Sequence, residues 1–360
     1  MPSSRVFPDL TKSPFVVAAA AFVCAAICIP ATASAQSLFP NSTDNNAHLS
    51  VGAAQLDIGS SFLQRLGREA TYGFAARDKS GGGGASQSTA DPLYRTWVET
   101  YGISAQTDPQ GSFVGDRRRT LGIVGGIGAT IAPGLNIGFS VDQSRTKIDV
   151  PLAFQNATLD MTQIGVNASY VNGPWTFAMA AVHGFAQIVS NRQTGFGSAL
   201  ASYRGSIDGV LGEVNYTYSF GQSRIVPKLA LEYVAARTDA FQEFGGLNPV
   251  SVAGASGDRA RVLAGAEVGH YWIVGQQAFD VSAYGKFVDN FSQNVGSVQV
   301  NLANNFINVQ GIRESMYGAD AGAAASYIMS NTARLYANYD GRFRDGFTSH
   351  QGTVGVELKW

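Results

Sequence analysis

The chain ends in the eight residues Thr353-Val354-Gly355-Val356-Glu357-Leu358-Lys359-Trp360. Apolar residues alternate strictly with polar residues or glycine along this stretch, which is the period of a β-strand with one apolar face. A helix turns by about 100° per residue, so the same pattern would spread apolar side chains around the whole cylinder. The sequence therefore predicts a strand that ends on an aromatic residue.

A terminal strand leaves a sheet edge open to aggregation unless another strand pairs with it. A closed barrel removes this edge, because the last strand pairs with the first. The stretch resembles the C-terminal assembly signal of bacterial outer-membrane barrels. That resemblance implies a role in assembly for Gly355, Leu358 and Trp360.

The composition supports a surface that meets lipid. Charged residues make up 14% of the 360 residues, against roughly 25% in a typical soluble domain. Glycine is abundant at 42 residues, as are Phe at 21 and Tyr at 14. Basic and acidic residues are nearly balanced, 25 against 26, so the charge gives no reason to expect a nucleic-acid partner.

The N-terminus has the three parts of a secretory signal peptide. Arg5 and Lys12 supply the positive charge, and residues 15–29 form an apolar run. Ala33 and Ala35 are the small residues that cleavage requires. We predict that residues 1–35 are a signal peptide cleaved after Ala35, since the apolar run is shorter than the ~20 residues of a spanning helix.

Residues 36–95 separate this leader from the first strand and divide into three parts. Residues 36 to about 52 are rich in Asn, Ser and Thr, and we expect them to be disordered. Residues 53–68 carry apolar side chains at mostly helical spacing, which predicts a short amphipathic helix, either on the periplasmic surface or inside a pore. Residues 78–90 include four consecutive glycines and are typical of a flexible linker.

From residue 96 onward, segments with alternating polarity are divided by turn residues. The turns at 132–134 and 172–174 combine Gly and Pro, as tight turns do. The twelve predicted strands are 96–105, 118–131, 135–145, 158–171, 175–190, 203–220, one through 229–233, 259–273, 279–287, 315–327, 334–343 and 353–360. This even number predicts an all-β fold, a single 12-stranded antiparallel transmembrane β-barrel over residues 96–360.

A soluble β-sandwich would show the same alternation, so the pattern alone does not exclude it. The leader, the few charges, the small residues at apolar positions and the terminal Trp favour the barrel. Aromatic residues at strand ends fit belts at the two membrane interfaces. These residues are Trp175, Tyr216, Tyr218, Tyr271, Trp272, Phe279, Tyr327 and Trp360.

One face of the predicted sheet carries charges that lipid would not tolerate. Glu232 lies between Leu231 and Tyr233, and a carboxylate facing lipid is costly, so its face must be wet. Ten charged residues at such positions are predicted to line a water-filled or plugged lumen: Glu99, Glu213, Glu232, Glu267, Lys286, Asp320, Asp340, Arg342, Glu357 and Lys359.

Residues 95–360 resemble the β-domain of autotransporters, the type V secretion proteins. The resemblance depends on the segments 94–102 (YRTWVETYG), 118–122 (RRTLG) followed by 125–128 (GGIG), and 336–343 (YANYDGRF) before the last strand. It implies a twelve-stranded barrel with a helix threading the pore and an exported passenger. It further implies outer-membrane lipid, periplasmic chaperones and the barrel assembly machinery as partners of a monomeric barrel in the bacterial outer membrane.

The chain departs from the family pattern before the barrel. Residues 36–95 are too few for the long β-solenoid passengers typical of the family, and they show no repeat. Either the passenger is reduced to a short surface peptide, with the helix as residual passenger or pore plug, or the barrel works alone. The two functions are therefore translocation or display of the chain's own N-terminal segment, and a stand-alone channel or structural barrel.

An enzyme on a barrel is the third alternative, and the sequence argues against it. Such an enzyme needs a His close to a Ser or Asp at the rim, and His48, His183, His270 and His350 have no such neighbours in the sequence. Both Cys residues lie in the leader, which excludes Cys-based metal sites from the mature chain. We therefore predict no catalytic residue, no metal and no cofactor.

Two short motifs are given ordinary interpretations. Some members of the family are cleaved inside the pore at an Asn-Asn pair, but Asn45-Asn46 precedes the expected helix, so we do not expect cleavage there. The glycines of 125–128 fall within a strand with no helix after them, so they are not a phosphate loop. Strand packing or room in the lumen explains them.

Overall fold

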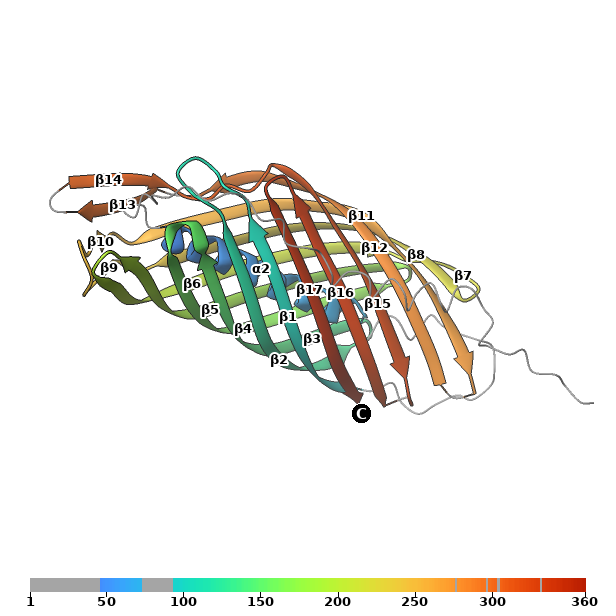
Figure 1. The fold of residues 1–360 in the computed structure, drawn as a ribbon. Coiled ribbons are helices and arrows are strands. Elements are labelled where there is room, and N and C mark those ends of the chain that lie inside the picture. Colours follow the sequence, from blue (N-terminus) through green and yellow to red (C-terminus); the bar gives the residue numbers. More distant parts are fainter. Residues whose placement is uncertain (1–45, 73–92, 276, 296, 303–304, 331) are drawn as a thin grey trace, which may run out of the picture. The chain divides into compact units, whose positions relative to one another are not determined.

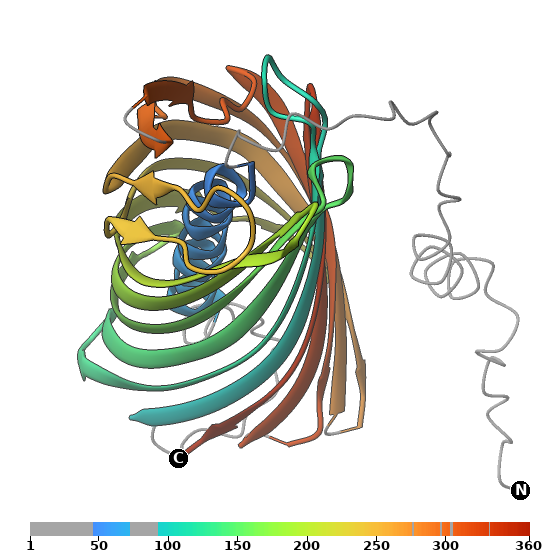
Figure 2. The ribbon, with the colours of Figure 1, turned by 60° about the vertical axis from the view of Figure 1, so that its left-hand side comes forward.

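The computed structural model describes residues 46–72, 93–275, 277–295, 297–302, 305–330 and 332–360. Twelve long strands form a closed antiparallel β-barrel around one helix, α2 (Asn46–Tyr72) (Figures 1 and 2). The strands are β1 (Tyr94–Thr107), β2 (Asp116–Ala132), β3 (Leu135–Val150), β4 (Gln155–Asn172), β5 (Trp175–Thr194), β6 (Gly197–Tyr216), β8 (Ser223–Thr238), β11 (Ala255–Val274), β12 (Gln277–Asn294), β15 (Tyr317–Ile328), β16 (Ala333–Arg344) and β17 (Phe347–Lys359). The predicted fold is confirmed.

The last strand closes the barrel against the first. β1 and β17 pair in antiparallel register from Arg95 opposite Lys359 to Thr107 opposite Phe347. Beyond the ladder, the amide of Tyr94 donates to the carbonyl of Trp360 at 2.9 Å, and the amide of Trp360 donates back at 3.0 Å. The terminal residue therefore takes part in closure, and the edge that the last strand would otherwise expose is paired.

The two ends of the barrel differ in the length of their connections. At the end where the chain terminates, two-residue turns such as Pro133 and Gly134 join β2 to β3, with Gly134 at a φ of +75°. At the opposite end the connections include residues 239–254 and 295–316. We call these the turn end and the loop end. In outer-membrane barrels short turns face the periplasm and longer loops face outward.

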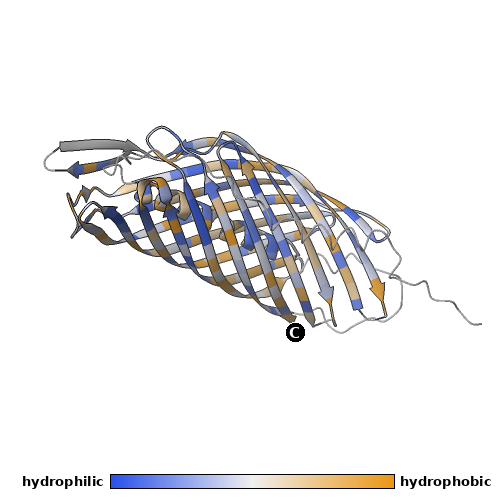
Figure 3. Cartoon of the chain, viewed as in Figure 1, coloured by the Kyte–Doolittle hydropathy of each residue, from blue (hydrophilic) through white to orange (hydrophobic). Residues whose placement is uncertain are grey.

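Hydrophobic and hydrophilic residues alternate along the strands (Figure 3). Along strands such as β3 and β17, exposed residues alternate with buried ones. Leu335 and Leu358 are 44% and 47% exposed on the outer face, which excludes a sandwich with these residues in a dry interior. β5, β6 and β11 each have 20 residues, about twice the 9–11 that cross a bilayer. These strands therefore extend beyond the membrane, and the predicted segments were too short.

The predicted aromatic belts need a correction. All eight predicted aromatic residues lie at the turn end, so they form one belt and not two. The apolar residues that point outward nearer the loop end include a different aromatic set: Phe185, Tyr233, Phe287, Tyr317 and Phe343. Phe287 stacks on Tyr317 with ring centroids 5.8 Å apart. Strand ends at one rim were mistaken for two interfaces because strand length was underestimated.

The sequence analysis also missed the elements at the loop end. A four-stranded sheet forms there from β9 (Phe241–Gln242), β10 (Ser251–Val252), β13 (Ser297–Leu302) and β14 (Asn305–Gln310). At the turn end, the short strand β7 (Tyr218–Phe220) continues β6 along β8 and falls within the predicted segment 203–220. At the loop end, a 3-10 turn, η2 (Pro151–Ala153), precedes β4. The alternation of Val298, Val300 and Leu302 was a signal for β13 in the sequence.

The helix is longer than predicted, beginning at Asn46 rather than residue 53 and ending at Tyr72. The expectation of disorder is therefore wrong for residues 46–52, and Asn46 begins the helix instead of preceding it. Asn45, the signal peptide and the glycine linker lie outside the described residues. Among the described residues, no helix is both long and apolar enough to cross a membrane.

Candidate functional site: the barrel interior and its helix

The apolar face of α2 packs against one side of the barrel wall. Phe62, Leu63 and Leu66 are at most 1% exposed and face β4, β5, β6 and β8. Glycines in the wall make this approach possible: a Cβ on Gly165 would lie 2.5 Å from Leu66 Cδ1, closer than any real contact. The helix therefore lies inside the pore and not on the periplasmic surface (Figure 2).

The wall opposite this face of α2 is itself apolar, which the sequence analysis did not expect. Five side chains of the wall point inward on this side and are at most 3% exposed: Leu159, Met161, Ile188, Ile207 and Leu211. A Cβ on Gly67 of the helix would come within 2.7 Å of Leu211 Cδ2. The ten residues predicted for the lumen are all charged, and the apolar side of the interior was not foreseen. Burial against α2 explains the difference, because apolar residues on both surfaces leave water together.

The opposite face of α2 is anchored by a buried arginine. Arg65 Nε lies 2.8 Å from a carboxylate oxygen of Glu99 on β1, and its guanidinium lies 3.5 Å from Asp142 on β3. The guanidinium also stacks over the Tyr101 ring at 3.8 Å, and Tyr101 donates to Asp142 at 2.8 Å. All four side chains are nearly fully buried. One helix cation therefore joins two strands.

A second anchor lies nearer the loop end and has the opposite polarity. Asp57 of α2 accepts from Arg118 on β2 at 2.8 Å and lies 3.4 Å from Arg259 on β11. Ser60 bonds to Arg261 on β11, whose Nε lies 2.8 Å from Glu232 on β8. The helix carboxylate thus meets wall arginines, while the helix arginine of the first anchor meets wall carboxylates.

The two ends of α2 are fixed at the two ends of the barrel. At the loop end, Asn46 Oδ1 accepts from the amide of Val114 at 3.0 Å, and His48 Nδ1 lies 3.0 Å from Tyr203 Oη. At the turn end, Arg95 at the start of β1 donates to Glu69 at 2.9 Å. The chain therefore runs through the barrel from the loop end to the turn end.

These anchors fix the position of the helix more than they stabilise it. Burying two charges costs much of what their attraction returns, but removing one partner costs about 3–5 kcal/mol because the other charge stays buried. At this axial position of α2, the pairs of Arg65 and Asp57 are satisfied together. The ion pairs thus define the register of the helix, and apolar packing supplies the driving force.

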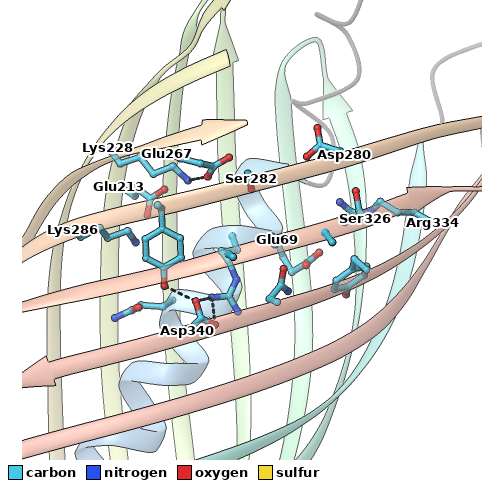
Figure 4. Close-up of a pocket in the computed structure, with 18 residues that line it drawn as sticks. Glu69, Glu213, Lys228, Glu267, Asp280, Ser282, Lys286, Ser326, Arg334 and Asp340 are labelled. Atoms are coloured by element: carbon cyan, nitrogen blue, oxygen red, sulfur yellow. Dashed lines mark hydrogen bonds and ion pairs between the residues drawn. The ribbon is translucent and has the colours of Figure 1, made fainter. Parts of the chain in front are cut away.

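A cavity of about 80 Å³ remains beside the C-terminal half of α2 (Figure 4). That volume has room for several water molecules. Its walls carry both signs of charge from seven strand residues and two helix residues: Glu213, Lys228, Glu267, Asp280, Lys286, Arg334, Asp340, Arg68 and Glu69. Among them, Lys228 Nζ lies 2.8 Å from Glu267, and Arg68 lies 3.0 Å from Asp340.

The ten charged residues predicted for the lumen lie on the inner side of the wall. Glu99, Glu232, Asp340 and Arg342 contact α2 directly, Arg342 through the carbonyl of Asp57 at 3.4 Å. The remainder bond or pack mainly among wall residues: Glu213 with Asn215, Glu267 with Arg224 and Lys228, Lys286 over the Tyr284 ring, Asp320 with Arg344, and Glu357 with Arg334 and Lys359.

The residues predicted for assembly lie at the closing strand. Leu358 and Trp360 point outward, with Trp360 61% exposed, whereas Gly355 points inward beside the Tyr336 ring. A Cβ on Gly355 would lie 2.5 Å from that ring. Ala33 and Ala35 lie outside the described residues.

The partners that hold the helix were not predicted from the sequence. These are Arg65, Asp57 and Glu69 on α2 and Arg95, Arg118, Asp142, Arg259 and Arg261 on the wall. Alternation could have found three of them, because Arg95 shares a face with Glu99, and Arg259 and Arg261 share one with Glu267. It could not have shown which wall charge meets which helix charge.

The histidines have partners that the sequence did not reveal. His183 lies 2.7 Å from Asp208 on the outer face, His270 lies 2.8 Å from Ser223, and His350 lies 2.8 Å from Tyr339. These partners lie on adjacent strands, so the sequence neighbours of the His residues could not show them. Among the described bonds of these three residues, none joins one His to both a hydroxyl and a carboxylate, as a triad requires. In the described parts of the chain, no group of three or more His, Cys, Asp or Glu could hold a metal ion.

Comparison with known proteins bears on the whole barrel. The family model described as Autotransporter beta-domain matches residues 96–340. The structure is similar to the translocator domain of the autotransporter NalP from Neisseria meningitidis, with 16% identity, a TM-score of 0.69, and coverage of 88% of this chain and 100% of that one. It is also similar to the β-domain of the Bordetella autotransporter BrkA, with 15% identity, a TM-score of 0.55, and coverage of 74% and 100%. At these identities the structural likeness concerns the fold alone. A search among curated proteins finds no match.

Proposed function

The chain belongs to the autotransporter β-domain family, and from this premise we propose that the outer-membrane barrel translocates its own N-terminal segment and displays it at the cell surface. In this proposal α2 then remains in the barrel and closes the pore. The family is one of translocators and not of enzymes, which favours transport over hydrolysis.

The observation that carries the proposal is the direction of α2. Its first residues bond to groups at the loop end, and Glu69 near its last turn bonds to Arg95 at the turn end. Since loops of outer-membrane barrels face outward, the helix begins at the outward end of the barrel. That direction supports export of everything between the predicted cleavage site and Asn46.

The exported segment in this proposal is short. With cleavage after Ala35, only residues 36–45 precede the helix. The segment that we expect antibody or protease to reach from outside is therefore residues 36–45 and not 36–52, because residues 46–52 are mostly buried within the barrel. We further propose that periplasmic chaperones and the barrel assembly machinery deliver the chain to outer-membrane lipid, and that the barrel works as a monomer without nucleic acid or cofactor.

A tag-accessibility experiment on intact cells tests this proposal. One variant carries a protease-cleavable epitope after Gln36, and the matched control carries the same epitope within the glycines at 81–84, on the other side of α2. Protease added outside should remove the first epitope and spare the second. If both epitopes resist until the outer membrane is opened, the N-terminal segment is periplasmic and the chain is a stand-alone barrel.

A further inference from the structure

The outer face of β2 shows where the apolar band of the barrel ends. Its outward residues Ile131, Ile127, Ile123 and Leu121 are 56%, 60%, 51% and 74% exposed. The ten residue steps from Ile131 to Leu121 span about 33 Å along the strand. A strand tilt of about 40° reduces this length to about 25 Å of membrane, which is the height of a typical lipid-facing band. The next outward residue, Arg119, therefore lies at the edge of the band nearer the loop end.

Two like charges meet at this edge. Arg119 on β2 lies directly opposite Lys147 on β3 in the antiparallel ladder, and both side chains are exposed on the outer face. Like charges directly opposite each other destabilise a sheet. The arrangement costs stability unless an anion lies between the two cations.

Neighbouring charges on the same face are balanced within the protein. Arg145 on β3 forms a two-pronged pair with Asp160 on β4 at 2.5 and 2.9 Å. Arg117 lies opposite Asp149 across the β2–β3 ladder. In the part of the chain that the structure describes, neither Arg119 nor Lys147 has an ion-pair partner. This opposed pair thus brings two cations together with no acidic residue directly opposite either of them on the adjacent strands.

The pair of cations lies next to an apolar surface, so this part of the outer face suits an amphiphile with a charged headgroup and apolar chains. Leu121, the most exposed of these outward residues of β2, lies immediately membrane-ward of Arg119 on the same face, followed by Ile123 and Ile127. On β3, Arg145 and Gln143 come between Lys147 and the apolar Val141. Cations above an aliphatic surface match a phosphate headgroup above its acyl chains. Loops of such barrels face outward, so this edge lies at the outer leaflet.

We propose that Arg119 and Lys147 bind a phosphate group of an anionic lipid in the outer leaflet, with Leu121 against its acyl chains. The phosphate oxygens accept charge-assisted hydrogen bonds from both side chains and relieve their repulsion. The bound lipid then links β2 to β3. This inference uses the location of the barrel and is independent of what the barrel exports.

Lipid titration of the purified mature chain, refolded in nonionic detergent, tests the proposal. The probes are phosphorylated lipid A and the same lipid with its phosphates removed, read out by native mass spectrometry. The double variant Arg119→Gln/Lys147→Gln should bind phosphorylated lipid A about 10-fold or more weakly than the unmodified chain. The matched control Arg145→Gln/Asp160→Asn removes two charges from the same face and should bind as the unmodified chain does.

Further measurements keep the result decisive. Without lipid, the double variant should melt no lower than the unmodified chain, because the opposed charges are gone, and this shows that it folds. Equal binding of the two lipids, or unchanged binding by the double variant, would overturn the proposal. Competition by millimolar inorganic phosphate that abolishes lipid binding would also overturn it, since the site would then hold a free anion.

Discussion

At the scale of single residues, the face on which a side chain lies decides what it tolerates. Leu231 and Glu232 are adjacent on β8, yet Leu231 is 55% exposed on the lipid side and Glu232 is 1% exposed beside Arg261. An aliphatic residue suits lipid, and a carboxylate there is costly. Within the barrel the same carboxylate has a guanidinium at 2.8 Å.

Substitutions at these two neighbours should fail in different ways. Leu231→Arg should hinder insertion into lipid vesicles, at a cost of about 2–4 kcal/mol if the site is near the bilayer midplane. Glu232→Ala should insert normally but melt at a lower temperature, because Arg261 stays buried without its partner. Insertion is measured by the gel shift of the folded barrel, and melting by heating the inserted protein. Equal insertion defects from both changes would refute the assignment of faces.

At the scale of elements, the regular alternation of polar and apolar residues predicted the strands, whereas amino-acid composition did not predict the start of the helix. All twelve barrel strands could be predicted, because lipid on one side and protein on the other impose a period of two. The first turns of α2 could not be predicted. Their polar residues Asn46 and His48 are buried only because Val114, Tyr203 and Thr238 satisfy them from distant strands, and composition alone predicted disorder.

His48 should make the docking of α2 sensitive to pH. It lies at the loop end beside Tyr203, Thr238 and Phe241, and burial lowers the pKa of its imidazole from 6.5 to about 4. A released helix takes up a proton below pH 6.5, whereas the docked helix does not. Docking is therefore strongest above pH 6.5 and weakens as pH falls toward 4, by about 30-fold at pH 5.

Conductance of single barrels in a planar bilayer measures this effect. Openings should become more frequent between pH 7.5 and pH 5 in the unmodified chain, and His48→Gln should lose most of that change. His350→Gln is the matched control, because His350 faces outward on β17 with Tyr339 as its partner. A His48→Gln barrel with the full pH response would place the sensitivity in the carboxylates of the wall.

At the scale of the whole molecule, the barrel is closed around a helix that divides its interior. Alternation placed Glu99, Glu232 and Asp340 on the inner side, but it carries no information on which of them meets the helix. That pairing depends on the rotation and axial position of α2, which the apolar wall residues Ile207 and Leu211 help to set. The sequence could predict which residues face the interior, but not which of them contact one another.

Closure by the last strand suggests two separable roles for Trp360. Its backbone bonds to Tyr94 in both directions, while its side chain is 61% exposed and points away from the interior. A substitution keeps the backbone bonds, so Trp360→Ala should leave the melting temperature of the refolded barrel nearly unchanged. If the assembly machinery recognises the exposed ring, the same variant should reach the outer membrane of living cells at a severalfold lower level.

Tyr94→Ala provides the matched control for this prediction. Tyr94 is 52% exposed, and its ring centroid lies 6.4 Å from that of Trp360. It makes the same backbone bonds from the first strand, so it shares the structural role of Trp360 without being the final residue. Assembly in cells and melting after refolding should both be close to normal for Tyr94→Ala. If Trp360→Ala lowers both assembly in cells and the melting temperature, the ring stabilises closure of the barrel and is not recognised by the assembly machinery.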